Sequence, residues 1–381
     1  MQVFRIRPMK SKYIYFDNAA TSFPKPECVI KRTSDFVRHC MANPGRSSHK
    51  LAMKSAEEIY SVRERVCNLL CYHYPERVVF TAGATAALNL AIKTSIKEGS
   101  HVLISDIEHN STLRAVHALK LKGICDYSVF DTDNTELSIK SLLRKETTHV
   151  ISTLSSNVDG RSVDEAVLSR VTDELGLALI LDGSQRIGHG RFDLSKIHFQ
   201  TLCCAGHKAL FGFPGVGFCV FGNDFSSDTF IEGGSGTDSK SYVMPSRLPE
   251  HFEAGTLPLP AIVSLGAGID FILDVGLAVI EEKLSQDTKL FIDMLSEIKG
   301  INLFKGNSGI VTFTHEKLGS EVIAKRLDEQ KIAVRSGFHC APLAHNKLGT
   351  YSDGTVRASL SYLNDAKEIL RFGEALRKII L

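Results

Sequence analysis

The sequence lacks a long apolar run, a large net charge and any regular pairing of cysteines. Its 381 residues carry a formal charge of only +2, which predicts no strong attraction to nucleic acid or to an anionic membrane surface. No apolar stretch approaches membrane-spanning length, and the first eight residues have no signal-peptide apolar region. We therefore expect a cytoplasmic protein that binds neither nucleic acid nor membrane.

The nine cysteines are scattered and odd in number, which argues against a disulfide framework. Cys67 and Cys71 lie four residues apart in a helical pattern, and Cys203 and Cys204 lie in an apolar strand. Neither pair has a second pair at metal-site spacing, so no metal site is predicted. No internal repeat or low-complexity segment interrupts the chain.

The length exceeds what one hydrophobic core usually supports, so two domains are expected. From Val78 onward short apolar runs alternate with helical patterns, which is typical of an α/β protein with a mostly parallel sheet. A long helical run over about 261–295 separates this part from a smaller α+β segment. We expect a large domain over 16–260, and a small domain formed by an N-terminal arm, 1–15, together with 261–381.

Two apolar runs end in residues of opposite charge. Residues 177–181 form a predicted buried strand that ends at Asp182, and residues 201–205 form another that leads to Lys208. Ligand sites of open α/β sheets gather at the carboxyl ends of such strands. Together the two residues suit pyridoxal phosphate, because a lysine can form a Schiff base with its aldehyde and an aspartate can hold its pyridine nitrogen protonated. Taken singly, a surface lysine and a helix-capping aspartate are the commoner outcome.

Two further turns follow predicted strands. Small residues at Gly83, Ala84 and Thr85 lie between a strand and a helix, where backbone N–H groups and the helix dipole can face a phosphate. A plain strand-to-helix turn would have the same composition. His109 follows the strand at 101–105 and could stack on a flat cofactor, although a solvated or core histidine is the more usual case.

These motifs, taken in order from Asp17–Thr21 to Arg357, resemble the cysteine desulfurases among the fold-type I, class V aminotransferase-like enzymes that use pyridoxal phosphate. The loop Arg335–Ala341 is most similar to the Suf-type branch, which includes selenocysteine lyases. The resemblance covers nearly the whole chain. It implies a large domain with a mostly parallel seven-stranded sheet and a smaller α+β C-terminal domain.

The resemblance also implies roles for individual residues toward the cofactor. Lys208 would carry pyridoxal 5′-phosphate and shuttle the substrate's α-proton, and Asp182 would pair with the ring nitrogen. Gln185 would bind the ring hydroxyl, and His109 would stack on the ring and act in catalysis. The phosphate would be held by the turn Gly83, Ala84 and Thr85, by His207, and by Thr256 of the other subunit of a homodimer with a shared active site.

For the substrate, the resemblance implies that Cys340 is the nucleophile and forms a persulfide while L-cysteine becomes L-alanine. Arg357 would bind the substrate carboxylate in a bidentate pair, and Asn157, Arg335 and Asn18 would also contact the substrate. Arg335 and His339 could favour the Cys340 thiolate. The sulfur would pass, through an acceptor protein, toward iron–sulfur cluster assembly or thio-cofactor synthesis.

Other functions fit part of the same pattern. A selenocysteine lyase would use the same residues with selenocysteine as substrate. An aminotransferase of this fold would have no use for Cys340. A non-enzymatic sulfur-carrier scaffold or a regulator that senses pyridoxal phosphate is the remaining alternative, and the intact Lys208 and the absence of an attached DNA-binding domain argue against it.

Overall fold

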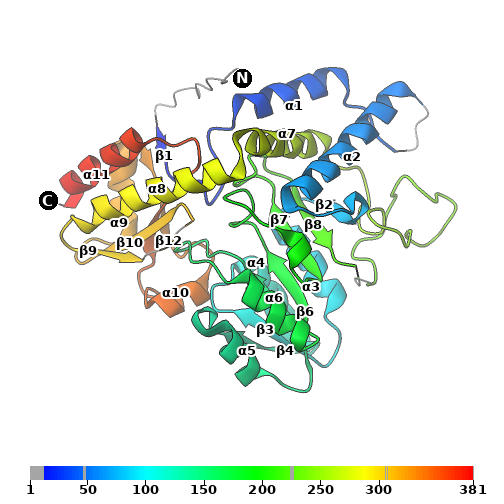
Figure 1. The fold of residues 1–381 in the computed structure, drawn as a ribbon, viewed down its shortest axis with the longest axis horizontal. Coiled ribbons are helices and arrows are strands. Elements are labelled where there is room, and N and C mark those ends of the chain that lie inside the picture. The colour runs from blue at the N-terminus through cyan, green and yellow to red at the C-terminus, as the bar shows by residue number, and fades with distance from the viewer. Residues whose placement is uncertain (1–12, 46–48, 224–226, 305, 307, 381) are drawn as a thin grey trace.

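The computed structural model describes residues 13–45, 49–223, 227–304, 306 and 308–380. Two β-sheets organise the chain, a seven-stranded sheet built by its first two thirds and a four-stranded sheet built by its last third (Figure 1). Most of the predicted N-terminal arm, residues 1–12, lies outside the described residues.

The strands and helices alternate along most of the chain. The strands are β1 (Ile14–Tyr15), β2 (Val78–Thr81), β3 (Ser100–Ser105), β4 (Cys125–Phe130), β5 (Thr147–Thr153), β6 (Ala178–Asp182), β7 (Thr201–Ala205), β8 (Gly217–Phe221), β9 (Ile301–Phe304), β10 (Ile310–His315), β11 (Ile332–Ala333), β12 (Arg335–Gly337) and β13 (Thr355–Ser359). The α-helices are α1 (Glu27–His39), α2 (Lys50–Leu70), α3 (Ala84–Ser95), α4 (Asn110–Leu121), α5 (Thr135–Leu142), α6 (Glu165–Glu174), α7 (Leu259–Val275), α8 (Leu277–Ser296), α9 (Ser320–Glu329), α10 (Pro342–Leu348) and α11 (Ala366–Ile380).

The seven-stranded sheet has the order β2-β8-β7-β6-β5-β3-β4. Only β8 runs antiparallel to its neighbours β2 and β7, and the other pairings are parallel. The mostly parallel seven-stranded sheet predicted from the sequence is thus confirmed. Apart from β4, its strands are almost wholly buried because helices cover both faces, and two separate buried clusters mark those two faces.

The parallel strands β3, β5, β6 and β7 end at the same edge of this sheet, so the residues that follow them come together there. Asp182 is the last residue of β6, and Lys208 follows β7 by three residues. Between the two strands the register pairs Asp182 with Cys203. The sheet itself therefore brings the two predicted cofactor residues to one side of the molecule.

The four-stranded sheet has the order β12-β13-β10-β9 and is antiparallel throughout. Helices α8 and α9 pack on it, and α11 packs against these two helices (Figure 1). Strand β1 pairs with β11, so the start of the described chain lies beside a strand of its last third. The expected division into a large and a small domain, with its boundary at residue 260, stays a prediction.

The long helical run predicted over about 261–295 is formed by two helices. Helices α7 and α8 meet at Gly276, whose φ of 91° ends one helix and begins the next, and their axes differ by 82°. Glycine adopts this conformation without the clash that a side chain would cause. Within the described residues, no single helix is long and apolar enough to cross a membrane, and only this bent pair passes a test of length and composition.

The cysteines differ widely in exposure. Cys67, Cys125, Cys203, Cys204 and Cys219 are buried, and Cys40 is half-buried, whereas Cys28, Cys71 and Cys340 are exposed. Burial raises the pKa of the buried thiols Cys67, Cys125, Cys203 and Cys204. These four thiols therefore remain protonated near neutral pH.

Candidate active site

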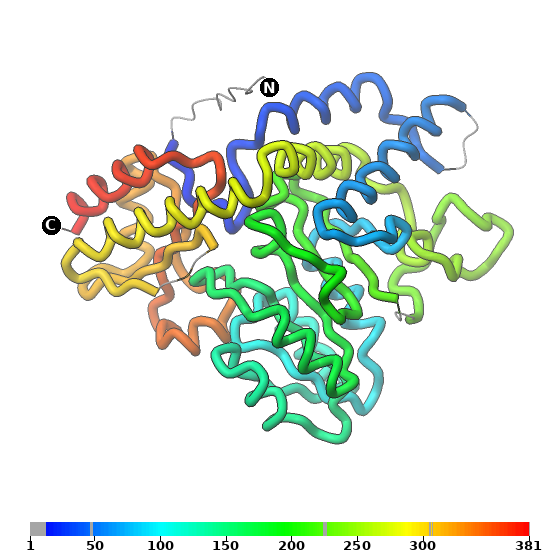
Figure 2. Tube along the Cα trace, viewed as in Figure 1, coloured from blue at the N-terminus to red at the C-terminus, as the bar shows by residue number. Residues whose placement is uncertain are grey.

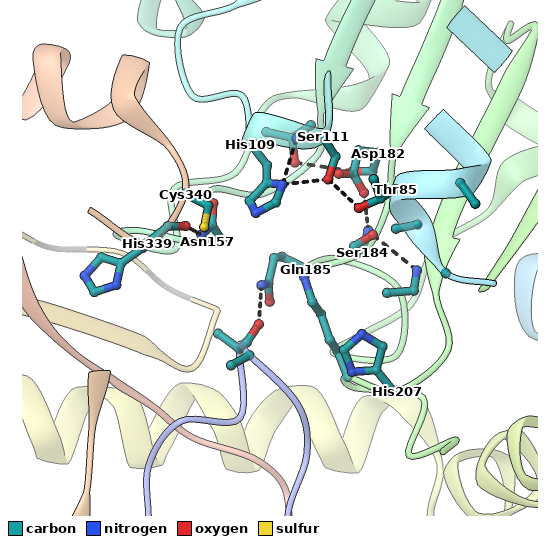
Figure 3. A pocket seen from close by; sticks show the side chains of 18 of the residues that line it. Thr85, His109, Ser111, Asn157, Asp182, Ser184, Gln185, His207, His339 and Cys340 are labelled. Atoms are coloured by element: carbon teal, nitrogen blue, oxygen red, sulfur yellow. Dashed lines mark hydrogen bonds between the residues drawn. The ribbon is translucent and has the colours of Figure 1, made fainter. Parts of the chain in front are cut away.

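A cavity of about 640 Å³ opens at the carboxyl edge of the seven-stranded sheet (Figure 3). This volume is in the usual range for a small-molecule site. Most of the residues predicted from the sequence line it, and they come from both sheets: Gly83, Ala84, Thr85, His109, Asn157, Asp182, Gln185, His207, Lys208, Arg335, Cys340 and Arg357.

Lys208 and Asp182 line this same cavity from neighbouring strand ends. Asp182 is buried, and its Oδ1 accepts a hydrogen bond of 2.9 Å from the backbone N–H of Ser184. The pKa of Lys208 is lowered, chiefly by burial; Asp182 opposes this effect, and Arg357 adds to it. A lysine whose ammonium is disfavoured in this way is suited to act as a nucleophilic amine and a base.

His109 caps the start of α4 and projects into the cavity (Figure 3). Its Nδ1 accepts a hydrogen bond of 3.0 Å from the backbone N–H of Ser111 and lies 2.9 Å from the Ser111 hydroxyl. Burial, and then the nearby charge of Lys208, lower the pKa of His109 to about 4. The ring is therefore neutral at pH 7, as a ring that stacks on an aromatic cofactor should be.

The start of α3 faces the cavity with small residues. Gly83 precedes the helix with a φ of 148°, which a side chain would strain, and Ala84 and Thr85 form the first turn. The Thr85 hydroxyl lies 2.8 Å from that of Ser111. Nearby, His207 has a buried Nδ1 without a hydrogen-bond partner among the described residues, and burial lowers its pKa to about 4.

The unpaired polar atoms of the cavity fit pyridoxal phosphate. Gln185 donates through Nε2 to the carbonyl of Ala19 at 2.9 Å, and its buried Oε1 has no partner in the described part of the chain. An acceptor left unpaired in this way is suited to a ring hydroxyl, and the unpaired Nδ1 of His207 is suited to a phosphate. Asp182 supplies the carboxylate for a pyridine nitrogen.

Arg357 on β13 is almost completely buried at the cavity wall. Its two terminal nitrogens donate to Asp17 Oδ1 at 2.7 Å and to the carbonyl of Asn157 at 2.8 Å. Its Nε has no partner among the described atoms. A bidentate pair with a substrate carboxylate would use Nε and would displace Asp17 from the neighbouring nitrogen.

Cys340 is exposed at the cavity mouth. A nitrogen of Arg335 lies 4.0 Å from its sulfur. His339 turns away from that sulfur (Figure 3) and its Nε2 lies 2.9 Å from the Thr355 hydroxyl. Burial lowers the pKa of His339 to about 2, so it supplies no charge to Cys340, and its expected role in ionisation is not supported.

Two predicted site residues do not line the cavity. The Asn18 amide donates to the carbonyl of Ser359 at 2.9 Å and to Asn364 Oδ1 at 3.2 Å, so it joins β1 to β13 and contacts no cavity space. Thr256 is exposed in the segment before α7. Neither residue lines the cavity of its own subunit. The substrate role of Asn18 and the phosphate role of Thr256 stay predictions.

Sequence reasoning gave no role to Glu108, the residue before His109. Glu108 is fully buried, and its Oε1 accepts hydrogen bonds of 2.6 Å from the Ser105 hydroxyl and from the backbone N–H of Thr153. Burial, with a smaller contribution from Asp182, raises its pKa to about 8. Its position beside His109 was visible in the sequence, but its burial was not.

Asp17, Ser111 and Ser184 were also missed, although all three lie in stretches that the sequence singled out. Ser111 and Ser184 contact His109 and Asp182, each two residues away, whereas Asp17 forms an ion pair with Arg357, far along the chain. No local pattern marks this last contact.

Two solved structures with the same fold are named cysteine desulfurases. One from Thermococcus onnurineus NA1, in its apo form, has a TM-score of 0.86 and 26% identity over 97% of this chain and 94% of that one. The CsdA enzyme of Escherichia coli has a TM-score of 0.87 over the same shares at 22% identity, a likeness of fold alone. The fold and the cavity thus define the class of fold-type I enzymes that use pyridoxal phosphate.

The model of the aminotransferase class-V family matches residues 14–372, and the chain belongs to this family. Two relatives named probable cysteine desulfurase come from Methanothermobacter thermautotrophicus and Pyrococcus abyssi. Each is 30% identical to this chain over 98% of its length and 96% of the relative's own length. Membership of the family implies pyridoxal phosphate as the cofactor and confirms the resemblance seen in the sequence.

Proposed function

We propose that the protein is a cysteine desulfurase, which converts L-cysteine to L-alanine and leaves the sulfur as a persulfide on Cys340. The observation that carries the proposal is the exposed Cys340 sulfur at the mouth of the cavity that Lys208 and Asp182 line. An enzyme of the same class that only moves amino groups has no need of a thiol there.

The residues at the carboxyl edge of the seven-stranded sheet would hold the cofactor. Lys208 would bind it covalently, Asp182 would hold its ring nitrogen, and His109 would cover its ring. Thr85 and His207, with the backbone at Gly83 and Ala84, would hold its phosphate. Pyridoxal phosphate bound there supplies an electron sink that weakens the carbon–sulfur bond of the substrate.

The substrate would enter from the side of the four-stranded sheet. Arg357 would bind its carboxylate through Nε and the nitrogen that now pairs with Asp17. Lys208, with its lowered pKa, would take the substrate's α-proton. Asn157 borders this space, but its amide donates to the carbonyl of His339, so its support for the substrate would come chiefly through Arg357 and the Cys340 loop.

The sulfur transfer needs only the Cys340 thiolate, the substrate and a proton. The Cys340 thiolate attacks the substrate sulfur, a sulfur–sulfur bond forms, and the carbon–sulfur bond breaks. The carbon keeps the bonding electron pair and takes a proton, which gives the methyl group of alanine. Arg335, 4.0 Å from the Cys340 sulfur, would stabilise the thiolate before attack.

The decisive experiment replaces Cys340. In the Cys340→Ala variant we expect alanine and sulfide production from L-cysteine to fall to background, while the absorbance of bound cofactor persists. Cys28→Ala, which removes another exposed thiol on α1, should retain full activity. Mass analysis of the wild-type protein after one turnover should find one added sulfur on Cys340. A Cys340→Ala variant that remains active would refute the proposal.

Substrate preference separates the related activities. Selenium leaves carbon more readily than sulfur does, so a selenocysteine lyase would keep its activity on selenocysteine when Cys340 is replaced. Amino transfer to pyruvate or 2-oxoglutarate would instead identify an aminotransferase. Binding of cofactor without turnover of any of these amino acids would identify a carrier or a sensor.

The proposal includes a homodimer with shared sites. Thr256 lies outside its own cavity, in the segment between β8 and α7 that loops out from the body of the molecule (Figure 2). Large apolar side chains of α1 and α2, among them Ile30, Val37 and Met53, are also exposed, and burying them supports a second copy as neighbour. The persulfide would pass to an acceptor protein, and the reaction requires a compartment that keeps thiols reduced, which supports a cytoplasmic location.

A further inference from the structure

Lys347 forms a charged cluster just beyond the Cys340 loop. It lies near the end of α10, and its Nζ is 2.5 Å from Asp106 Oδ2, 2.6 Å from Asp131 Oδ1 and 3.1 Å from Asp133 Oδ2. Asp106 follows β3, and the other two aspartates follow β4. The cluster therefore joins the helix after Cys340 to the carboxyl edge of the seven-stranded sheet.

The cluster is shielded enough for its charges to matter. The Lys347 side chain is only 16% exposed and that of Asp106 only 15%, whereas those of Asp131 and Asp133 are 46% and 57% exposed, so the pair of Lys347 with Asp106 is the shielded one. Charges in such a place are less screened by water and salt than surface pairs are. The hydrogen bond from Lys347 is also the main cause that lowers the pKa of Asp131. Without the ammonium, Asp106 and Asp131 would lose the cation that lies between them, whereas Asp133 would keep its ion pair with Arg161.

Helix α10 is held by packing as well as by this cluster. The helix has seven residues, too few to be stable by itself. Its Ala344 joins a small buried cluster with Val158 and Ala341, its Leu343 packs against the larger cluster on one face of the seven-stranded sheet, and its His345 is fully buried. The ion pairs of Lys347 add to these contacts near the C-terminal end of the helix.

The Cys340 backbone needs this support. His339 and Cys340 have φ angles of 48° and 60°, a left-handed conformation that side-chain-bearing residues rarely adopt. Two hydrogen bonds of 2.7 Å hold it, from Asn157 Nδ2 to the carbonyl of His339 and from the backbone N–H of Asn110 to the carbonyl of Cys340. Both donors belong to the seven-stranded side, as do the aspartates of the cluster.

The geometry points to Lys347 as a positioning residue that holds the nucleophile loop against the cavity through Asp106 and Asp131. This role rests on the proposed function of Cys340 as the sulfur acceptor. Lys347 touches neither substrate nor cofactor. It acts by keeping α10, and with it the Cys340 sulfur, within reach of the substrate.

The test compares Lys347→Met, which keeps the length but removes the charge, with Lys347→Arg, which keeps the charge. We expect Lys347→Met to slow persulfide formation in a single turnover by on the order of 10-fold to 100-fold, as small displacements of reacting groups do. The absorbance of the bound cofactor should not change. In cofactor-free protein, iodoacetamide should modify Cys340 several-fold faster in Lys347→Met, because the loop is released. Lys347→Arg should restore both values toward wild type.

Lys140→Met is the matched control, since it breaks an exposed ion pair of 2.6 Å with Glu136 on α5, and both values should remain at wild type. If Lys347→Met fails to fold, Asp131→Asn weakens the cluster while Asp106 keeps its pair, and a smaller change in the same direction is expected. If the alkylation rate and the single-turnover rate of Lys347→Met equal those of the wild type, the inference is wrong. It is also wrong if Lys347→Met and Lys347→Arg lose the same share of the single-turnover rate. The alkylation readout needs no turnover, so it stands apart from the outcome for Cys340→Ala.

Discussion

Glu108 is a buried acid beside the ring that would cover the cofactor, and its charge state links stability to pH. Its pKa is raised from 4.5 to about 8, so the folded state holds a proton that the unfolded state releases above pH 4.5. The stability this proton brings is fully present below pH 4.5 and is lost as pH rises through 8. Protonated, the carboxyl group can donate through Oε2, which has no partner among the described residues.

We therefore expect the Glu108→Gln variant to lose this pH dependence. Gln can accept the same hydrogen bonds from Ser105 and Thr153 without a charge. Between pH 5 and pH 7 the free energy of unfolding of the wild type should fall by about 1.4 kcal/mol per pH unit relative to the variant. Urea unfolding at several pH values measures the difference. A difference that stays constant across this range would show that Glu108 titrates normally.

At the scale of elements, the antiparallel pair of β12 and β13 brings Arg335 and Arg357 to the cavity. The two arginines are direct partners in its register, and Gly337 pairs with Thr355. Gly354, just before β13, has a φ of 64°, and a Cβ there would lie 2.6 Å from the carbonyl carbon of Gly337. The backbones meet too closely at this point for any side chain.

Gly354→Ala should therefore be costly. Gly349→Ala is the control, because Gly349 has a similar φ of 68° but nothing within 4 Å of its would-be Cβ. We expect about 1–2 kcal/mol of destabilisation at Gly349 from the left-handed backbone alone. At Gly354 the displaced Gly337 should add about 1–3 kcal/mol, together with a loss of turnover. Equal losses of unfolding free energy in the two variants would contradict the close contact.

Local patterns predicted the elements that build the cofactor side of the cavity. The apolar runs that end at Asp182 and Ala205 are buried strands of one parallel sheet, so their ends had to meet. The nucleophile side was less predictable. Helix α10 is short and has a pattern too brief to notice, and the turn of His339 away from Cys340 depends on Thr355, which lies 16 residues further on.

Contacts between distant parts of the chain account for the remaining misses. The amide of Asn18 is taken by Ser359, 341 residues away, and that of Asn157 by His339, 182 residues away. A sequence motif gives the chemical type of such a residue but not its partner. The break at Gly276 is a different case, since a glycine inside a long helical pattern was visible and only its φ was not.

At the scale of the whole molecule, the exposed Thr256 predicts that each site is completed by a second subunit. Lys208→Ala and Thr256→Ala should each lower activity as homodimers. Mixed dimers, refolded or co-expressed, contain one site with both residues intact. If half of the dimers are mixed, activity should return to about one quarter of wild type. If mixed dimers form but activity does not recover, Thr256 contributes to the site of its own subunit and the prediction is wrong.

The uneven exposure of the cysteines has a consequence for an enzyme that carries sulfane sulfur. A persulfide is an electrophile, so any thiolate that reaches it can take its outer sulfur atom. Such a reaction would move sulfur from Cys340 to other cysteines of the protein. Five of the nine thiols are sealed in the interior, and four of those are held in their unreactive protonated form by burial. The fold therefore confers chemoselectivity, because the interior thiols cannot compete with an external acceptor for the outer sulfur of the Cys340 persulfide.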